Sequence, residues 1–128
     1  EQVLLNLCIN ARDAMQGAGT IRIGVRAVDA LDHTCASCRQ HVQERSQVEI
    51  EVSDTGSGIR PEVLERMFEP FFSTKEVGKG SGMGLASVHG IVHEYGGHIV
   101  VDTAPGKGAR FRILFPALAG DKETPWAP

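Results

Sequence analysis

Four segments of the chain alternate apolar and polar residues with the two-residue period of a β-strand. Residues 20–29 and 48–54 each read as a half-buried strand, and the second ends on an acidic residue before a glycine turn. Residues 98–104 and 109–116 are joined by the turn sequence PGKG, which is typical of a hairpin. The pattern therefore predicts two pairs of strands, well separated along the chain.

Helices are predicted in three further segments. Residues 1–16 contain good helix formers and stop at QGAG. A short helix is expected after Pro61, which suits a first-turn position, and a longer one over 83–97 is ended by two glycines. The order of elements predicts an α+β fold. We expect a two-layer α/β sandwich in which helices cover one face of a mixed, mostly antiparallel sheet.

Length and charge exclude several classes of protein. The 128 residues suit one domain, with a net charge of −3 that argues against a nucleic-acid surface. The sequence has no apolar run long enough to cross a bilayer and no signal-peptide pattern. Three cysteines form a poor disulfide framework and favour a reducing cytoplasm. Both ends look cut, which predicts a fragment with a domain over 1–118 and a tail over 119–128.

The first predicted helix carries a polar stripe on an otherwise apolar surface. Asn6, Asn10 and Asp13 project from nearly the same side of the helix at 3.6 residues per turn. A solvent-exposed face is the simpler interpretation and the favoured one from the helix alone. The alternative is a polar cavity, because Asn oxygens are hard neutral ligands suited to a magnesium ion that also binds phosphates.

Two glycine-containing segments are candidates for binding a ligand. In SDTGSGI, Asp54 ends a strand, and Gly56 and Gly58 allow close backbone approaches, although short turns of this kind are common. In GKGSGMGLASV, glycines run directly into a helix start, where free amides can hold an anion. Phosphate binding is the preferred interpretation of the second segment, over a plain linker.

Five motifs in a fixed order carry a family resemblance: NLCINARDAM, DTGSGI, FEPFFSTK, GKGSGMGL and GKGARF. They resemble the N, G1, F, G2 and G3 boxes of the catalytic ATP-binding domain of sensor histidine kinases. That domain is part of the superfamily shared with DNA gyrase, heat-shock chaperones and mismatch-repair proteins. The resemblance covers nearly the whole chain except residues 30–46, an insertion relative to the minimal pattern, and the tail.

The resemblance implies a Bergerat-type sandwich with ATP held under a mobile lid. Asn10 would coordinate Mg²⁺, Asn6 would support the ion or the phosphates, and Asp54 would accept the adenine amino group. Three phenylalanines would anchor the lid or simply belong to the core: Phe68, Phe71 and Phe72. The full set of residues expected to bind ATP and Mg²⁺ comprises Asn10, Asp13, Asp54, Gly56, Gly58, Ile59, Phe72, Lys75, Lys79, Gly80, Ser81, Gly82, Met83, Gly84 and Leu85.

One position distinguishes branches of this superfamily. Members that hydrolyse ATP place a Glu four residues before the magnesium Asn, where this chain has Asn6, which cannot act as a general base. The resemblance therefore implies transfer of the ATP γ-phosphate to a His on a separate dimerisation domain, followed by a response regulator. The parent protein would be cytoplasmic or membrane-attached, and this fragment monomeric. The alternatives are an ATP-hydrolysing module, a non-catalytic nucleotide-binding module and a serine kinase of the anti-sigma type.

Two features depart from the family pattern. Ala109 stands where the family often carries Thr or Ser, so a hydroxyl near the adenine is in question. The insertion contains HTCASCRQH, whose four potential zinc ligands are His33, Cys35, Cys38 and His41. An inert polar loop is the preferred interpretation, because four zinc ligands rarely crowd into one short loop. A metal site is the alternative and a redox pair ranks below it, while His89, His93 and His98 are expected to be ordinary helix and strand residues.

Overall fold

The fold is taken from a computed structural model, which describes residues 2–16, 18–70, 72 and 84–117; the side chains of 29–33 and 41–45 are outside this description. In chain order the elements are α1 (Gln2–Met15), β1 (Ile21–Thr34), β2 (His41–Asp54), α2 (Pro61–Leu64), α3 (Gly84–Glu94), β3 (His98–Thr103) and β4 (Ala109–Pro116).

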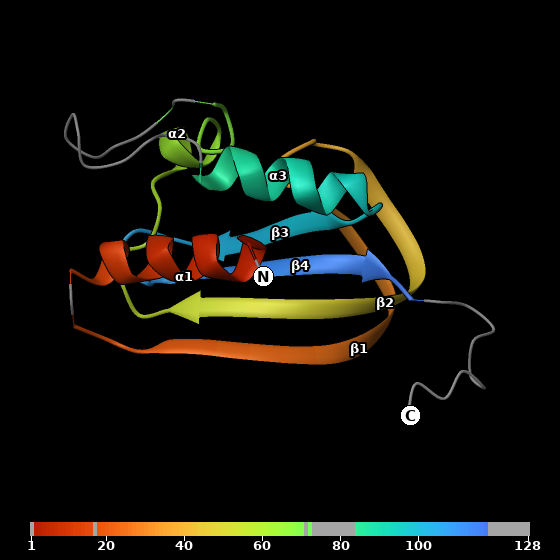
Figure 1. Ribbon diagram of the computed structural model, residues 1–128, viewed down its shortest axis with the longest axis horizontal. Helices are drawn as coiled ribbons and strands as arrows, with labels where there is room; N and C mark the ends of the chain where they lie inside the picture. Colours follow the sequence, from red (N-terminus) through yellow and green to blue (C-terminus); the bar gives the residue numbers. More distant parts are fainter. Residues whose placement is uncertain (1, 17, 71, 73–83, 118–128) are drawn as a thin grey trace.

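The four strands form one sheet in the order β1-β2-β4-β3. Every pairing is antiparallel: β1 with β2, β2 with β4, and β3 with β4. Helices α1 and α3 pack against each other and lie on the same face of the sheet (Figure 1). The predicted α+β sandwich is confirmed, and its described strands are wholly antiparallel.

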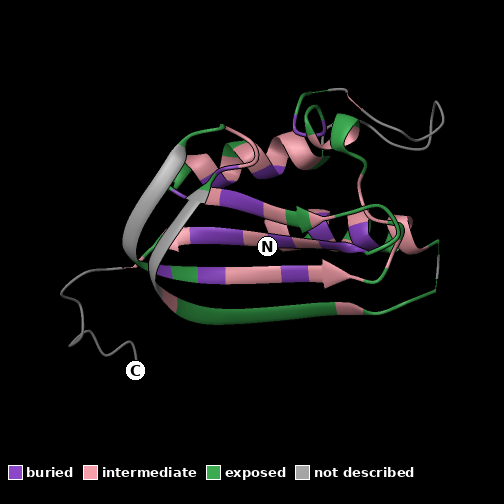
Figure 2. Ribbon diagram, turned by 180° about the vertical axis from the view of Figure 1, so that it is seen from behind, coloured by how far each residue is buried: buried purple, intermediate pink, exposed green. Residues whose placement is uncertain are grey.

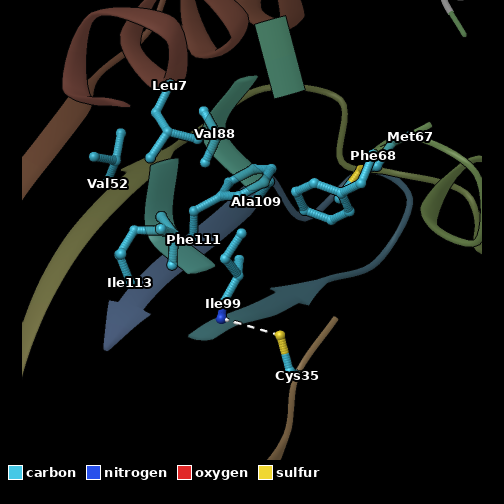
Figure 3. Close-up of a cluster of buried hydrophobic side chains, with 11 residues drawn as sticks. Leu7, Cys35, Val52, Met67, Phe68, Val88, Ile99, Ala109, Phe111 and Ile113 are labelled. Atoms are coloured by element: carbon cyan, nitrogen blue, oxygen red, sulfur yellow. Dashed lines mark hydrogen bonds between the residues drawn. The ribbon is translucent and has the colours of Figure 1, made fainter. Parts of the chain in front are cut away.

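The core lies between the two main helices and the central strands. Leu7 from α1 and Val88 from α3 meet Val52, Phe111 and Ile113 of the sheet, all nearly inaccessible to water (Figure 3). Burial is concentrated on β4 and β3, whereas β1 at the sheet edge is mostly exposed (Figure 2). Burial of apolar side chains on this scale is the main stabilising contribution to such a fold.

Residues 30–46, the insertion expected to form a polar loop, are mostly strand. Only residues 35–40 form a turn, because β1 continues to Thr34 and β2 begins at His41. β4 pairs with β2 only from Gln47 onward, so the outer part of the β1–β2 hairpin is a two-stranded ribbon. A ribbon without a third strand has no continuous buried face, so its sequence lacks the regular alternation on which strand prediction depends.

The first helix is less buried than its composition indicates. Leu7 and Ala11 are buried, but the side chain of Leu5 is 56% exposed and that of Ile9 is 37% exposed. Although its surface is apolar outside the polar stripe, α1 is therefore buried along one side only. Within the described ranges, no helix has the length and hydropathy needed to cross a membrane.

Candidate functional site

The polar stripe of α1 meets the beginning of α3. Asn6, Asn10 and Asp13 are all half-buried. The side-chain amide of Asn6 donates a hydrogen bond to the carbonyl oxygen of Gly84 at 3.1 Å, while its Oδ1 accepts one from Gln2 at 3.2 Å. The stripe is therefore more than a solvated face: it ties two helices together where α3 begins.

Asp54 ends β2 at the same end of the sheet. Its Oδ1 accepts a hydrogen bond from the backbone N–H of Gly56 at 2.8 Å, which fixes the carboxylate against its own turn. The next amide, that of Ser57, donates to the carbonyl oxygen of Ala14 near the end of α1, at 3.4 Å. The loop after β2 is thus held beside the carboxyl end of α1.

The 54–59 loop is packed against the turn between β3 and β4. Gly58 has φ +79° and a Cβ there would overlap the carbonyl oxygen of Ala104. Gly108 has φ +76° and a Cβ there would overlap the carbonyl oxygen of Asp54. The backbone N–H of Gly106 donates to the carbonyl oxygen of Ser57 at 2.6 Å. Glycine is therefore required at positions 58 and 108 by contacts within the protein itself.

A hydroxyl that the sequence analysis did not single out lies at this junction. The Oγ1 of Thr103 accepts a hydrogen bond from the N–H of Ile59 at 3.0 Å and donates one to the carbonyl oxygen of Gly108 at 2.7 Å. The hydroxyl joins the 54–59 loop to the turn between β3 and β4. It lies close in the chain to Ala109, where a hydroxyl was in question. A threonine ending a predicted strand was the only signal in the sequence.

Gly84 differs from the other glycines of the site. Among the described residues, none has an atom within 4 Å of a Cβ placed on Gly84, so their packing gives no reason for glycine there. Leu85 and Phe72 pack against the core, Phe68 belongs to it, and the guanidinium of Arg66 lies 4.9 Å from the centre of the Phe72 ring. The remaining expected lid residues lie outside the described residues: Phe71, Lys75, Lys79, Gly80, Ser81, Gly82 and Met83.

A second group of chemically active side chains lies at the other end of α3. Cys35 and Cys38, from the hairpin turn, are grouped with His93 of α3 and His98 of β3. These two histidines were expected to be ordinary helix and strand residues. The side chains of His33 and His41 are outside the described residues. No spacing in the sequence indicates this grouping, because its members come from three separate elements.

Comparison with known proteins identifies relatives of the whole chain. The family described as "Histidine kinase-, DNA gyrase B-, and HSP90-like ATPase" matches residues 1–119. "Sensor kinase CckA" of Brucella abortus is 48% identical over 100% of this chain and 13% of its own length. "Two-component sensor PprA" of Pseudomonas aeruginosa is 41% identical over 93% of this chain and 12% of its own length. The chain thus spans about an eighth of these curated relatives.

Solved structures with the same fold include ShkA and the catalytic domain of the histidine kinase ThkA. Full-length ShkA in complex with AMPPNP aligns with a TM-score of 0.68 and 31% identity, over 90% of this chain and 20% of that one. The nucleotide-free catalytic domain of ThkA aligns with a TM-score of 0.65 and 29% identity, over 90% of this chain and 64% of that one. The arrangement of helices and sheet seen here is therefore that of a histidine kinase catalytic domain.

Proposed function

Because the chain belongs to the histidine kinase-, DNA gyrase B- and HSP90-like ATPase family, we propose that it binds Mg-ATP and donates the γ-phosphate to a histidine on a dimerisation domain. It corresponds in sequence and fold to the catalytic domain of sensor histidine kinases. The phosphoacceptor domain would be part of the same protein, and a response regulator would take the phosphoryl group afterwards. The proposal places this domain in the cytoplasm.

The observation that carries the proposal is the meeting of separate motifs at one end of the sheet. Asn6 reaches the start of α3, and the loop after Asp54 contacts both the end of α1 and the β3–β4 turn. These segments are far apart in the sequence. Hydrophobic packing does not explain why each of them carries polar residues. A shared ligand accounts for their chemistry together.

The side chains at this end have the chemistry that Mg-ATP needs. The amide oxygen of Asn10 is a hard neutral donor of the kind that Mg²⁺ accepts beside phosphates and water. The carboxylate of Asp54 can accept a hydrogen bond from an exocyclic amine such as that of adenine. Glycine at position 84 has no side chain to block a ligand, and no atom of the described residues lies within 4 Å of the place a Cβ would take. Bound Mg²⁺ would neutralise phosphate charge.

Asn6 determines which reaction the site can support. Its amide is neutral and already holds Gly84 and Gln2, so it positions α3 and cannot remove a proton from water. Asn6 is therefore a positioning residue, and the chain offers no general base at this place. A site of this type holds ATP in position while a nucleophile from another domain attacks, which is the main requirement of phosphoryl transfer.

Calorimetry of the chain with Mg-AMPPNP is the direct test of nucleotide binding. Asp54→Asn should weaken binding about 10- to 100-fold, because a hydrogen bond to a charged group contributes about 1.5–3 kcal/mol. Asp102→Asn is the matched control, since that carboxylate pairs with Arg112 on the sheet and binding should not change. Equal affinity for the wild type and Asp54→Asn would contradict the assignment of Asp54.

Phosphotransfer needs the parent kinase, which contains the acceptor. Incubated with ATP labelled on the γ-phosphate, it should acquire label that is stable to base and lost in acid, as expected of phosphohistidine. The Asp54→Asn parent should acquire little. Label on serine would favour the serine-kinase alternative, and sustained release of phosphate without protein labelling would favour an ATP-hydrolysing module.

A further inference from the structure

We infer that Cys35, Cys38, His93 and His98 form a structural zinc site that fastens the tip of the β1–β2 hairpin to α3 and β3. The site is independent of the nucleotide proposal, because it lies at the opposite end of α3 from Gly84. In Figure 1 the hairpin curls over the right-hand end of α3, where β3 begins. Its ligands would be two sulfur atoms from one turn and two imidazole nitrogens from two other elements.

The distances match those of a tetrahedral zinc site. The ligand atoms of the four residues all lie within 4.8 Å of one another. Cys35 Sγ lies 3.6 Å from His93 Nε2, and Cys38 Sγ lies 3.6 Å from His98 Nδ1. Zinc bonds of about 2.3 Å to sulfur and 2.0–2.1 Å to nitrogen, at a tetrahedral angle, place S and N about 3.6 Å apart. Both of these sulfur–nitrogen pairs are therefore already at the spacing that zinc requires.

The protonation of His93 directs a lone pair toward the cluster. Its Nδ1 lies 2.8 Å from the carbonyl oxygen of His89, which can only accept a hydrogen bond, so Nδ1 carries the proton. In the neutral ring Nε2 is then unprotonated and faces Cys35 Sγ. A histidine ligand held by a carbonyl at its other nitrogen is the usual arrangement at zinc sites.

The surroundings of Cys35 stabilise a thiolate. Its side chain is fully buried, and the N–H of Ile99 donates to its Sγ at 3.4 Å (Figure 3). A buried thiolate requires a compensating positive charge, which a divalent cation supplies.

The turn that carries the cysteines is built to bring them together. Arg39 adopts φ +68°, an uncommon conformation for a residue other than glycine, and its N–H donates to the carbonyl oxygen of Cys35 at 2.9 Å. The N–H of Ala36 donates to the carbonyl oxygen of Ile99 at 2.7 Å. The turn therefore reaches across to β3, on the opposite edge of the sheet from β1.

A set of two thiolates and two imidazoles in this geometry selects zinc over magnesium or calcium.

Metal analysis of the full 128-residue chain, purified without added metal or chelator, tests the inference. We expect about one zinc per chain, with Cys35→Ser, Cys38→Ser, His93→Gln and His98→Gln each losing most of it. Cys8→Ser is the matched control, because Cys8 lies on α1 outside the cluster, and it should retain its zinc. Cobalt in place of zinc should give a thiolate charge-transfer band that both Cys35→Ser and His93→Gln weaken, which reports the site even in a poorly folded variant.

Two further variants separate this ligand set from one confined to the loop. His33→Gln and His41→Gln should keep zinc. If they lost it while His93→Gln and His98→Gln retained it, the proposed set would be overturned. Folded wild-type protein without zinc that does not take up added zinc would also overturn the proposal, as would a Cys35–Cys38 disulfide in its place. A structural role further predicts that chelation lowers Tm by roughly 10 °C and that added zinc restores it.

Discussion

The two ends of α3 carry two different kinds of chemistry. At the amino end, Gly84 faces Asn6, and the site groups neutral amides with the carboxylates of Asp13 and Asp54, all hard oxygen donors. At the carboxyl end, His93 faces two cysteines, with soft sulfur and nitrogen donors. Magnesium with phosphates suits the first set and zinc suits the second. One short helix therefore separates a site proposed to bind a ligand reversibly from one proposed to hold the fold together.

The difference also concerns how each end is supported. The amino end of α3 joins the segment expected to form the lid, whereas the carboxyl end continues through a short turn into β3 and is covered by the hairpin. A kinase domain has to release and rebind nucleotide, so rigidity is useful at one end only. A zinc site at the carboxyl end would stabilise α3 without restricting its amino end, where nucleotide is proposed to bind.

Zinc removal is expected to have the largest effect. Stripping the metal with a strong chelator should lower the free energy of unfolding by about 3–4 kcal/mol, the value expected for a ligand present at several hundred to a thousand times its Kd. The Kd for Mg-AMPPNP, measured below the lowered Tm, should change less than about threefold. Denaturant melts with and without chelator, followed by calorimetry, measure both quantities. Parallel loss of stability and nucleotide affinity would show that the two ends are coupled.

Changing the proposed magnesium ligand should act on the opposite end alone. Asn10→Ala should weaken binding of Mg-AMPPNP about tenfold, because a ligand to the metal is removed. Binding of nucleotide without Mg²⁺ should change little, and zinc content should be unaffected. Asn10→Asp, which keeps an oxygen donor, should restore the magnesium dependence. Titrations at several Mg²⁺ concentrations distinguish these outcomes, and an unchanged Mg²⁺ dependence in Asn10→Ala would exclude Asn10 as a ligand.

The glycine at the loop–turn junction should be a stability position. Gly58→Ala places a Cβ against the carbonyl oxygen of Ala104 at φ +79°, so it should destabilise the chain by about 1–3 kcal/mol. Urea melts should show a lower midpoint with an unchanged m value. Gly24→Ala, where a Cβ meets nothing within 4 Å, is the control. A neutral Gly58→Ala would mean that the loop does not pack as described.

Much of the sheet could be predicted from the sequence, which also singled out the residues that we propose to bind nucleotide. Alternation located the core strands, and the closing hairpin through PGKG was confirmed by the pairing of β3 with β4. Residues Asn6 and Asp54 were singled out because amides and a carboxylate occurred in motifs of recognised order. The structure shows that Asn6 meets Gly84, and their roles toward ATP remain predictions.

The carboxyl end of α3 could not be predicted, for a topological reason. His93 and His98 are separated from Cys35 by more than fifty residues, so no spacing rule links them. They meet because the hairpin extends past the sheet and its turn bonds to Ile99 on the far edge. The outer parts of the two strands that carry this turn show no regular alternation, so the extension itself was missed. Both members of the cysteine pair were noticed, whereas their proposed partners depended on the fold.

The smallest expected effects provide the finest test of the two ends. Gly84 and Gly90 both lie on α3, and a Cβ at either position would have no atom of the described part of the chain within 4 Å. Each substitution by Ala should therefore raise the free energy of unfolding by about 0.4–1 kcal/mol, because glycine is the poorer helix former. If Gly84 is glycine so that a ligand can approach, Gly84→Ala should weaken Mg-AMPPNP binding several-fold, whereas Gly90→Ala should leave it unchanged. Melts and calorimetry on this matched pair separate helix propensity from ligand access, and identical affinities would remove Gly84 from the site.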